Sequence, residues 1–266
     1  MLKSNCRLEP LQAEFEFATS FADTARQMAM SYFRKSNGLA WKSDETPVTL
    51  ADTEIEDAFR KLVQTEFPAD GIFGEETGVS GRGRPRIWVV DPIDGTGAFA
   101  TGSPLFGVLL CLVVKEQAAF GVIDACATGE RWIGQRGKGA SLNGVTCATS
   151  GRTSLREASL ASTSIHLLGA RERRVFDKLS TEAAMIRLGG DCYAYGLLAS
   201  GHLDQIIEAG LKPFDFMALT VIIEEAGGVI SDWQGRPLTL NSSGDVLASA
   251  TADLHAQALK VIKETK

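Results

Sequence analysis

A chain of 266 residues, of which 44% are hydrophobic and 23% charged, can bury a substantial core in one large domain or two closely packed ones. The net charge of −6 without a block of Lys or Arg argues against a nucleic-acid-binding protein, and no run approaches the roughly 20 apolar residues that span a bilayer. Five widely spaced cysteines without a CxxC pair predict neither disulfides nor a zinc site, so we expect a cytoplasmic protein.

The chain begins with two predicted helices. From Leu8 onward, apolar residues recur every three or four positions, which predicts a long amphipathic helix that ends near Asn37. Asp52 opens a second predicted helix that ends before Pro68. The positions that we expect this second helix to bury are Ile55, Phe59, Leu62 and Val63.

A sheet is predicted after these helices. Residues 77–86 are rich in Gly and Arg, so we expect an exposed connector there. The apolar run 87–90 predicts a buried strand. Further strand patterns, separated by turn residues in the manner of an antiparallel sheet, cover 106–114, 118–124 and 129–144. Residues 1–145 are therefore predicted to form an α+β half of the molecule.

The second half of the chain changes to alternating strand and helix patterns. Residues 146–156 are rich in Ser, Thr, Arg and Gly and mark the passage between the halves. The alternation that follows favours an α/β layer over residues 146–266. The predicted strands cover 158–163, 184–188, 203–209, 229–233 and 246–250. The predicted helices cover 169–179, 192–199, 213–226 and 252–262.

The most informative stretch is Asp91-Pro92-Ile93-Asp94-Gly95-Thr96, which directly follows the predicted strand 87–90. Carboxylates at the end of a buried strand are costly unless a cation or hydrogen bonds compensate them. A bound metal ion is the simplest compensation. For any single acidic pair, however, a turn or a helix cap explains the acids equally well.

Further acids make a metal site the better interpretation. Glu75 and Glu76 follow an apolar stretch, and Asp215 begins a predicted helix. Carboxylates without nearby His or Cys suit a hard cation, Mg²⁺ or Mn²⁺, and disfavour zinc. The amides of Gly95 and Thr96, at a turn that opens a helix, can face an anion. Acids for a metal beside amides for a phosphate predict phosphoryl chemistry.

Several motifs in order along the chain resemble the inositol monophosphatase superfamily. They are Gly74-Glu75-Glu76, the stretch Trp88 to Thr96, and Asp215 with Glu224-Glu225-Ala226-Gly227-Gly228 downstream. The family's early segment is matched by Lys42, Asp44, Pro47-Val48-Thr49 and Asp52. The resemblance implies a layered α-β-α-β-α sandwich and a Mg²⁺-dependent phosphatase that acts on a small phosphorylated metabolite. It also implies a homodimer and inhibition by lithium.

By this resemblance, most of the acids are metal ligands. The first Mg²⁺ would be bound by Glu75, Asp91 and the carbonyl oxygen of Ile93. The second would be bound by Asp91, Asp94 and Asp215, so that Asp91 bridges the two ions. A third, weaker ion would be shared between Glu75 and water. Residues 1–145 would then carry most of the ligands, and residues 146–266 the last ligand and the leaving-group pocket.

The resemblance also implies roles in the attack on phosphate. Thr96 and Asp52 would orient and deprotonate the attacking water for direct in-line hydrolysis, with Glu76 nearby. The amides of Gly95 and Thr96 would hold the phosphate. Lys42 would belong to the substrate site.

Within the superfamily, the second half resembles the histidinol-phosphate phosphatase branch. The stretches that carry this likeness are 189–195, 211–216 and 101–107, although Gly97 stands where the branch has a basic or polar residue. Glu208 and Asp191 would line the leaving-group pocket, where two acids favour the cationic amine of histidinol. Alternatively, Glu208 binds hydroxyl groups and Asp191 caps the helix that begins at Cys192.

Other functions stay open at this point. Within the same enzyme class, the chain could be an inositol-1-monophosphatase or a broad-specificity small-molecule phosphatase. An alternative of another class is a non-catalytic, metal-binding regulatory protein. The complete set of acids argues against it, because a protein released from catalysis has no need for the water-activating pair of Thr96 and Asp52.

Overall fold

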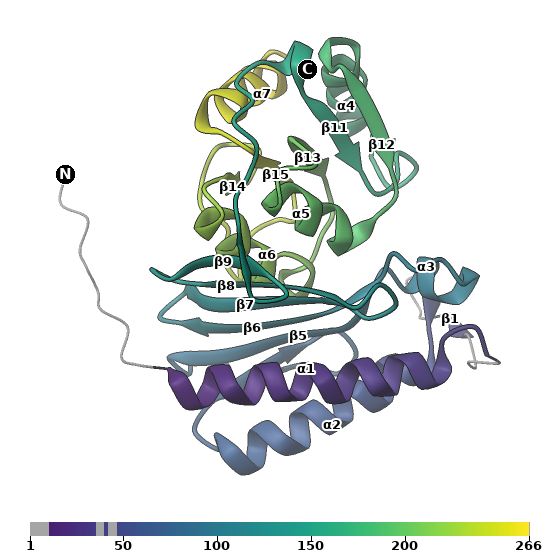
Figure 1. The fold of residues 1–266 in the computed structure, drawn as a ribbon, viewed down its shortest axis with the longest axis vertical. Helices are drawn as coiled ribbons and strands as arrows, with labels where there is room; N and C mark the ends of the chain where they lie inside the picture. The colour runs from purple at the N-terminus through teal and green to yellow at the C-terminus, as the bar shows by residue number, and fades with distance from the viewer. Residues whose placement is uncertain (1–10, 36–39, 42–46, 266) are drawn as a thin grey trace.

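The computed structural model of the chain describes residues 11–35, 40–41 and 47–265, in layers that alternate between helices and sheets (Figure 1). A pair of helices, an eight-stranded sheet, a second pair of helices, a five-stranded sheet and a last pair of helices follow one another. This order confirms the predicted α-β-α-β-α sandwich. Within the described residues, no helix is both long and apolar enough to cross a membrane.

The first layer consists of helices α1 (Gln12–Tyr32) and α2 (Leu50–Glu66), which lie on the outer face of the large sheet (Figure 1). The predicted first helix is confirmed over 12–32. It ends at Tyr32, earlier than the predicted end near Asn37, and the predicted start at Leu8 lies outside the described residues. On α2, the predicted burial of Leu62 is wrong, since its side chain is 41% exposed. Ile55, Phe59 and Val63 are fully buried, and this i, i+4, i+8 stripe covers the sheet without Leu62.

The large sheet holds its strands in the order β10-β9-β8-β7-β6-β5-β3-β4 and is antiparallel except where β3 runs parallel to β5. Its strands are β3 (Gly71–Gly74), β4 (Gly78–Ser80), β5 (Arg86–Asp94), β6 (Gly107–Val114), β7 (Gln117–Ala125), β8 (Glu130–Gln135), β9 (Gly139–Leu142) and β10 (Val145–Cys147). The predicted connector 77–86 therefore contains a strand, β4. The strand is only three residues long, Gly78-Val79-Ser80, which is too short for an alternating apolar pattern. A separate two-stranded ladder joins β1 (Ala40–Trp41) to β2 (Pro47–Val48).

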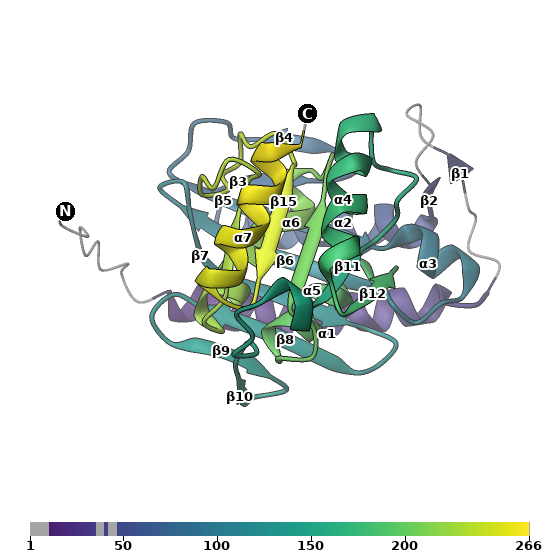
Figure 2. The same ribbon diagram turned by 90° about the horizontal axis from the view of Figure 1, so that it is seen from above.

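The small sheet has the order β12-β11-β13-β15-β14 and is of mixed direction (Figure 2). Its strands are β11 (Ser159–Ser162), β12 (Met185–Leu188), β13 (Gln205–Glu208), β14 (Val229–Ser231) and β15 (Val246–Ser249). Strand β11 is parallel to both β12 and β13, and the other pairings are antiparallel. Helices α4 (Ala170–Glu182) and α7 (Ala252–Glu264) cover its outer face with a separate apolar cluster, as predicted for an α/β layer.

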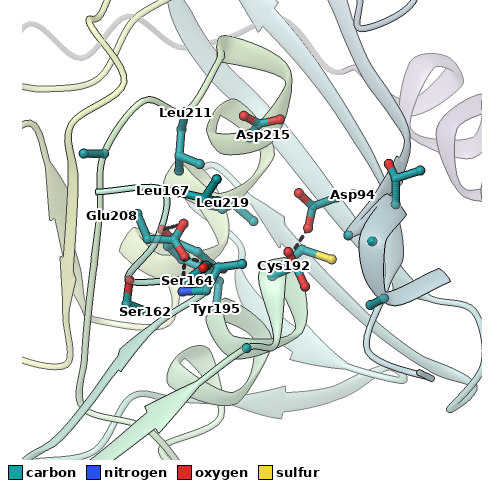
Figure 3. A pocket seen from close by; sticks show the side chains of 18 of the residues that line it. Asp94, Ser162, Ser164, Leu167, Cys192, Tyr195, Glu208, Leu211, Asp215 and Leu219 are labelled. Carbon is teal, nitrogen blue, oxygen red and sulfur yellow. Dashed lines mark hydrogen bonds between the residues drawn. The ribbon is translucent and has the colours of Figure 1, made fainter. Parts of the chain in front are cut away.

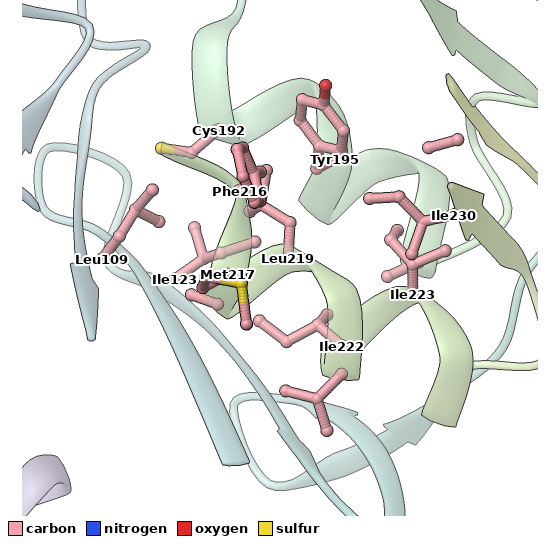
Figure 4. Packing of buried hydrophobic residues seen from close by; sticks show 14 of the residues in the cluster. Leu109, Ile123, Cys192, Tyr195, Phe216, Met217, Leu219, Ile222, Ile223 and Ile230 are labelled. Carbon is pink, nitrogen blue, oxygen red and sulfur yellow. The ribbon is translucent and has the colours of Figure 1, made fainter. Parts of the chain in front are cut away.

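Between the sheets lie α5 (Asp191–Ala199) and α6 (Pro213–Glu225), whose apolar side chains fill the central core (Figure 4). Helix α6 is buried nearly all round because it touches both sheets. Gly134 on β8 permits the close approach, since a Cβ there would lie 2.6 Å from the Ile222 Cα. The core around α6 contains residues of both predicted halves. The division of the chain into halves at residues 145 and 146 stays a prediction.

Candidate active site

The site is built around the end of β5, where the strand departs from regular pairing. Asp91 lies opposite Leu109 of β6 and Asp94 opposite Gly107, so three steps on β5 match two on its neighbour. This irregularity offsets the alternation of side chains along the strand and turns both carboxylates to the same side. The backbone N–H of Ile93 donates to the Asp91 carboxylate at 3.0 Å, which fixes the turn.

Carboxylates gather at this strand end in two groups. Asp91, Asp94 and Asp215 form one group, and Asp52, Glu75 and Glu76 form the other; in each, one oxygen per residue lies within 4.8 Å of the others. Asp215 is contributed by the first turn of α6, where its carboxylate accepts a hydrogen bond from the backbone N–H of Lys212 at 2.6 Å. The structure thus brings together all the predicted acidic metal ligands from both halves of the chain.

Burial and mutual repulsion of these carboxylates favour the binding of a cation. Burial, followed by repulsion from Glu75, raises the pKa of Asp91 well above its usual value. Burial and repulsion from Asp191 likewise raise the pKa of Asp94. Burial is also the main cause that raises the pKa of Asp215 to about 7. A hard divalent cation would relieve this repulsion, and neither group contains a His or Cys among the described residues, so the donors fit Mg²⁺ or Mn²⁺.

Glu56 supports one of the groups, and sequence reasoning did not single it out. Its buried carboxylate accepts hydrogen bonds from the backbone N–H groups of Glu76 at 2.7 Å and Thr77 at 3.0 Å, and from the Arg60 guanidinium at 2.8 Å. A Cβ on Gly74 would collide with this carboxylate. In the sequence, Glu56 is noticeable only as a charged residue next to Ile55, a position predicted to be buried. This signal is weak, because charged residues are common beside the apolar face of an amphipathic helix.

Thr96 and Asp52 are also brought together. The Thr96 hydroxyl lies 3.0 Å from the Ile93 carbonyl oxygen and 3.5 Å from an Asp52 carboxylate oxygen. The other Asp52 oxygen accepts the backbone N–H of Thr49 at 2.9 Å, and burial raises the pKa of Asp52 to about 6. Gly95, just before helix α3 (Thr96–Thr101), has a φ of 86°, a conformation that glycine adopts without strain.

A cavity of about 470 Å³ opens beside these groups, between the strand end and the second half of the chain (Figure 3). Glu208 lies on its far side, where its carboxylate accepts hydrogen bonds from the Thr163 backbone N–H at 2.9 Å, the Thr163 hydroxyl and the Tyr195 hydroxyl at 3.1 Å. The protein itself therefore supplies three donors to Glu208.

Asp191 lines the same cavity but is held differently. The alternative that Asp191 caps α5 is wrong: Gly190 is the cap residue, and the N–H of Cys192 donates to Asp94 at 2.6 Å. In the part of the chain that the structure describes, no donor bonds to the Asp191 carboxylate. Burial and repulsion from Glu208 raise the pKa of Asp191 to about 7. Its φ of 43° would favour glycine, so this position carries a carboxylate in spite of backbone strain.

Two further predictions concern the rim of the site. Lys42, predicted for the substrate site, lies outside the described residues. Gly97, where a basic or polar residue was expected, lines the cavity, and a Cβ there would meet no atom within 4 Å. The missing side chain therefore leaves this side of the cavity open.

Comparisons with known proteins identify the family of the chain. The model of the inositol monophosphatase family matches residues 11–266. The chain is 38% identical over 253 residues to the chloroplastic bifunctional phosphatase IMPL2 of Arabidopsis thaliana, covering 92% of this chain and 73% of that protein. It is 36% identical over 238 residues to the histidinol-phosphatase of Chlorobaculum parvum, covering 89% and 92%.

A solved structure of an inositol monophosphatase has a similar fold. An inositol monophosphatase from Zymomonas mobilis superposes with a TM-score of 0.89 at 40% identity, covering 96% of this chain and all of that one. The fold and the clustered carboxylates define a phosphatase of the layered sandwich type. The chain belongs to the inositol monophosphatase family. Histidinol-phosphatases and inositol monophosphatases are both among its relatives.

Proposed function

We propose that the chain is a Mg²⁺-dependent phosphomonoesterase whose carboxylates hold the metal ions. Glu75, Asp91 and the Ile93 carbonyl would hold one ion, and Asp91, Asp94 and Asp215 another, with Mn²⁺ as a substitute. A weaker third ion would share Glu75. When bound, these ions neutralise charge on the phosphate and on the leaving oxygen. The support is the donor set, which consists of buried oxygens whose mutual repulsion a cation relieves.

The chain's own residues would then direct the attack. The Thr96 hydroxyl, within reach of Asp52, would orient the attacking water, and Asp52 would accept its proton, with Glu76 nearby. The amides of Gly95 and Thr96 would hold the phosphate at the turn that opens α3. A water placed there attacks in line with the leaving oxygen on the cavity side, toward Glu208.

For the substrate, we propose histidinol phosphate. The observation that carries this proposal is the Asp191 carboxylate, which lacks a bonded donor in the described residues and is repelled by Glu208 across the same cavity. A protonated amine between the two acids would satisfy Asp191 and relieve the repulsion. The hydroxyl groups of inositol supply no positive charge. The relatives named as histidinol-phosphatases are consistent with this choice.

Phosphate release tests both parts of the proposal. The substrates are histidinol phosphate, inositol 1-phosphate, fructose 1,6-bisphosphate and 3′-phosphoadenosine 5′-phosphate, each with Mg²⁺ and with EDTA. We expect histidinol phosphate to be the best substrate and turnover to require Mg²⁺. The Asp91→Asn variant should lose turnover while its circular dichroism spectrum stays native. Full activity of that variant would refute the metal assignment, and a tenfold preference for inositol 1-phosphate would refute the substrate assignment.

A homodimer is proposed as well. Strand β12 is an edge of the small sheet, and its side chains Met185, Ile186 and Leu188 are 48%, 39% and 53% exposed. Such an edge can be covered by the same edge of a second copy across a twofold axis. We expect analytical ultracentrifugation to find a dimer for the wild type and a monomer for Ile186→Arg; equal masses for the two would contradict this surface.

A reducing, cytoplasmic compartment is also proposed. Cys111, Cys126, Cys147 and Cys192 are all unpaired, which supports a location where thiols stay reduced. Localisation of a fluorescent fusion in the source cells tests this, and export of the fusion would contradict it.

A further inference from the structure

A second cavity, of about 740 Å³, is lined in part by Phe73 and Pro213, which lie two residues before Glu75 and Asp215. It is enclosed by the loop 81–85, by the turn between β6 and β7, and by the turn 239–242 of the second half of the chain. Phe73 and Pro213 form part of its wall. Its volume falls within the usual range for sites that bind small molecules.

The rim of this second cavity is positive although the whole chain has a net charge of −6. Arg82, Arg84 and Lys115 line it, against a single carboxylate, Glu116. Arg84 is occupied, because its guanidinium donates to the backbone carbonyls of Pro68 at 3.0 Å and Asp70 at 2.6 Å. The positive charge that remains for a ligand therefore comes from the other two cations.

Arg82 and Lys115 are available for a ligand. Among the residues that the structure describes, neither side chain forms an ion pair or a hydrogen bond, and both are exposed at the cavity rim. The Lys115 N–H donates to the Pro85 carbonyl at 2.8 Å, which joins the turn between β6 and β7 to the loop that carries Arg82. Two unpaired cations that line the same cavity favour an anionic ligand there.

The rest of the second cavity suits an apolar body and one polar contact. Phe73, Ile87, Pro213 and Leu240 provide an apolar wall, and the amide side chain of Asn241 has no bonded partner in the described chain. The neighbouring hydroxyls are already used within their own turn: the Ser242 hydroxyl accepts the Thr239 N–H at 2.9 Å. The lining thus combines an apolar surface with cations at one end.

This second cavity is separate from the active site but adjoins it. Phe73 directly precedes Gly74 and Glu75, and Pro213 lies two residues before Asp215. The rings of Phe73, which lines the second cavity, and of Phe214, which directly precedes Asp215, meet edge to face with centroids 6.0 Å apart. None of the proposed metal ligands lines the second cavity.

We propose that the second cavity is a binding site for a small organic anion with an apolar, ring-sized body. Arg82 and Lys115 bind the anionic group, and the wall around Phe73 and Pro213 packs against the body. The bound molecule contacts residues adjacent to the segments that carry Glu75 and Asp215, and it bridges the two halves of the chain.

Isothermal titration calorimetry with 2-naphthalenesulfonate tests this proposal, because a sulfonate is an anion that a phosphatase cannot hydrolyse. The test variant is Arg82→Gln/Lys115→Gln, which removes both charges and no bonded side chain. The matched control is Lys138→Gln/Arg156→Gln, which removes one exposed Lys and one exposed Arg elsewhere. The neutral comparison is 2-naphthol, and every titration is run both with Mg²⁺ and with EDTA, because an active site made of carboxylates does not attract a sulfonate once its metal ions are removed.

We expect one sulfonate per chain, a Kd at least about tenfold weaker in the test variant, and an unchanged Kd in the control variant and in EDTA. Binding of 2-naphthol should be weaker than that of the sulfonate. Equal affinity of the wild type and the test variant, binding that is lost in EDTA, or an absence of binding would each overturn the proposal.

Discussion

The carboxylate of Asp94 accepts a hydrogen bond from the backbone N–H of Cys192 at 2.6 Å, across the boundary between the large sheet and helix α5. One oxygen of Asp94 thus holds the start of the helix that carries Asp191, while the residue also belongs to the group with Asp91 and Asp215. The proposed metal site and the leaving-group cavity are therefore joined through a single side chain. A change at Asp94 should affect both.

Two substitutions of Asp94 separate these roles. Asp94→Asn keeps an oxygen that can accept the Cys192 N–H, whereas Asp94→Ala removes it, and both remove the charged ligand. We expect both variants to lose most activity, and Asp94→Ala to be less stable than Asp94→Asn by about 1 kcal/mol in EDTA. Urea unfolding midpoints measure the difference. Equal stability of the two variants would show that the hydrogen bond contributes nothing.

Glu56 is predicted to be a positioning residue for the group of Asp52, Glu75 and Glu76. Glu56→Gln weakens its hold on the Glu76 and Thr77 amides, so the Mg²⁺ concentration for half-maximal activity should rise about tenfold or more. Turnover at saturating Mg²⁺ should fall far less, because no reacting group is removed. Glu66→Gln, on the exposed face of the same helix, is the control and should behave as the wild type. An unchanged Mg²⁺ dependence in Glu56→Gln would contradict the assignment.

The hydroxyl of Thr96 is predicted to act in the chemical step. Thr96→Ala should lower kcat by about 100-fold or more with little change in KM, since the hydroxyl that orients water is lost. Thr96→Ser keeps the hydroxyl and should retain most of the activity. Stopped-flow or steady-state phosphate release measures both variants. Similar losses in Thr96→Ser and Thr96→Ala would assign the effect to packing of the methyl group instead.

His255 gives the chain a pH-dependent stability that is independent of the active site. Its imidazole lies between the Ser231 hydroxyl at 2.8 Å and the Ser249 hydroxyl at 3.0 Å. Ser231 donates onward to the Asp232 carbonyl and Ser249 accepts from Gln205, so the network is complete with a neutral ring. Burial lowers the pKa of His255 to about 4.

The lowered pKa of His255 makes the folded chain less stable in acid. Above pH 6.5 the His255 ring is neutral in the folded and the unfolded chain, and its contribution to the free energy of unfolding is fully present. As the pH falls from 6.5 toward about 4, only the unfolded chain takes up the proton, so the folded chain loses stability. We expect His255→Gln to remove a pH dependence of the unfolding free energy that amounts to about 3 kcal/mol between pH 6.5 and pH 4. Urea unfolding of both proteins at pH 7.5 and pH 4.5 measures it. Parallel losses in wild type and variant would contradict the prediction.

The layer order was predicted through the family resemblance, whereas most helices and strands and the acids were predicted from strong local patterns. Asp91 and Asp94 end a continuous apolar run, and α6 is apolar around its whole circumference, as a helix between two sheets must be. Strand β4 was missed because its three residues, Gly78-Val79-Ser80, are too few to show an apolar pattern. Glu56 was missed because its role depends on contacts with a turn 20 residues away.

Asp191 shows a further limit of sequence reasoning. An acid before a predicted helix normally predicts a cap, but here the carboxylate of Asp94, 98 residues away, takes the amide that a cap would bind. Only the folded chain shows that Asp191 is left with its carboxylate in the cavity. The substrate proposal therefore depends on tertiary structure, whereas the phosphatase class was already indicated by the motifs.

The most direct test of the substrate assignment compares histidinol phosphate with inositol 1-phosphate in the wild type and in Asp191→Asn, with saturating Mg²⁺. The quantity measured is the ratio of the two kcat/KM values. We predict that the wild type favours histidinol phosphate and that Asp191→Asn lowers the ratio by about tenfold or more, through the histidinol phosphate value alone. An unchanged ratio in Asp191→Asn, or a wild type that prefers inositol 1-phosphate, would contradict the account.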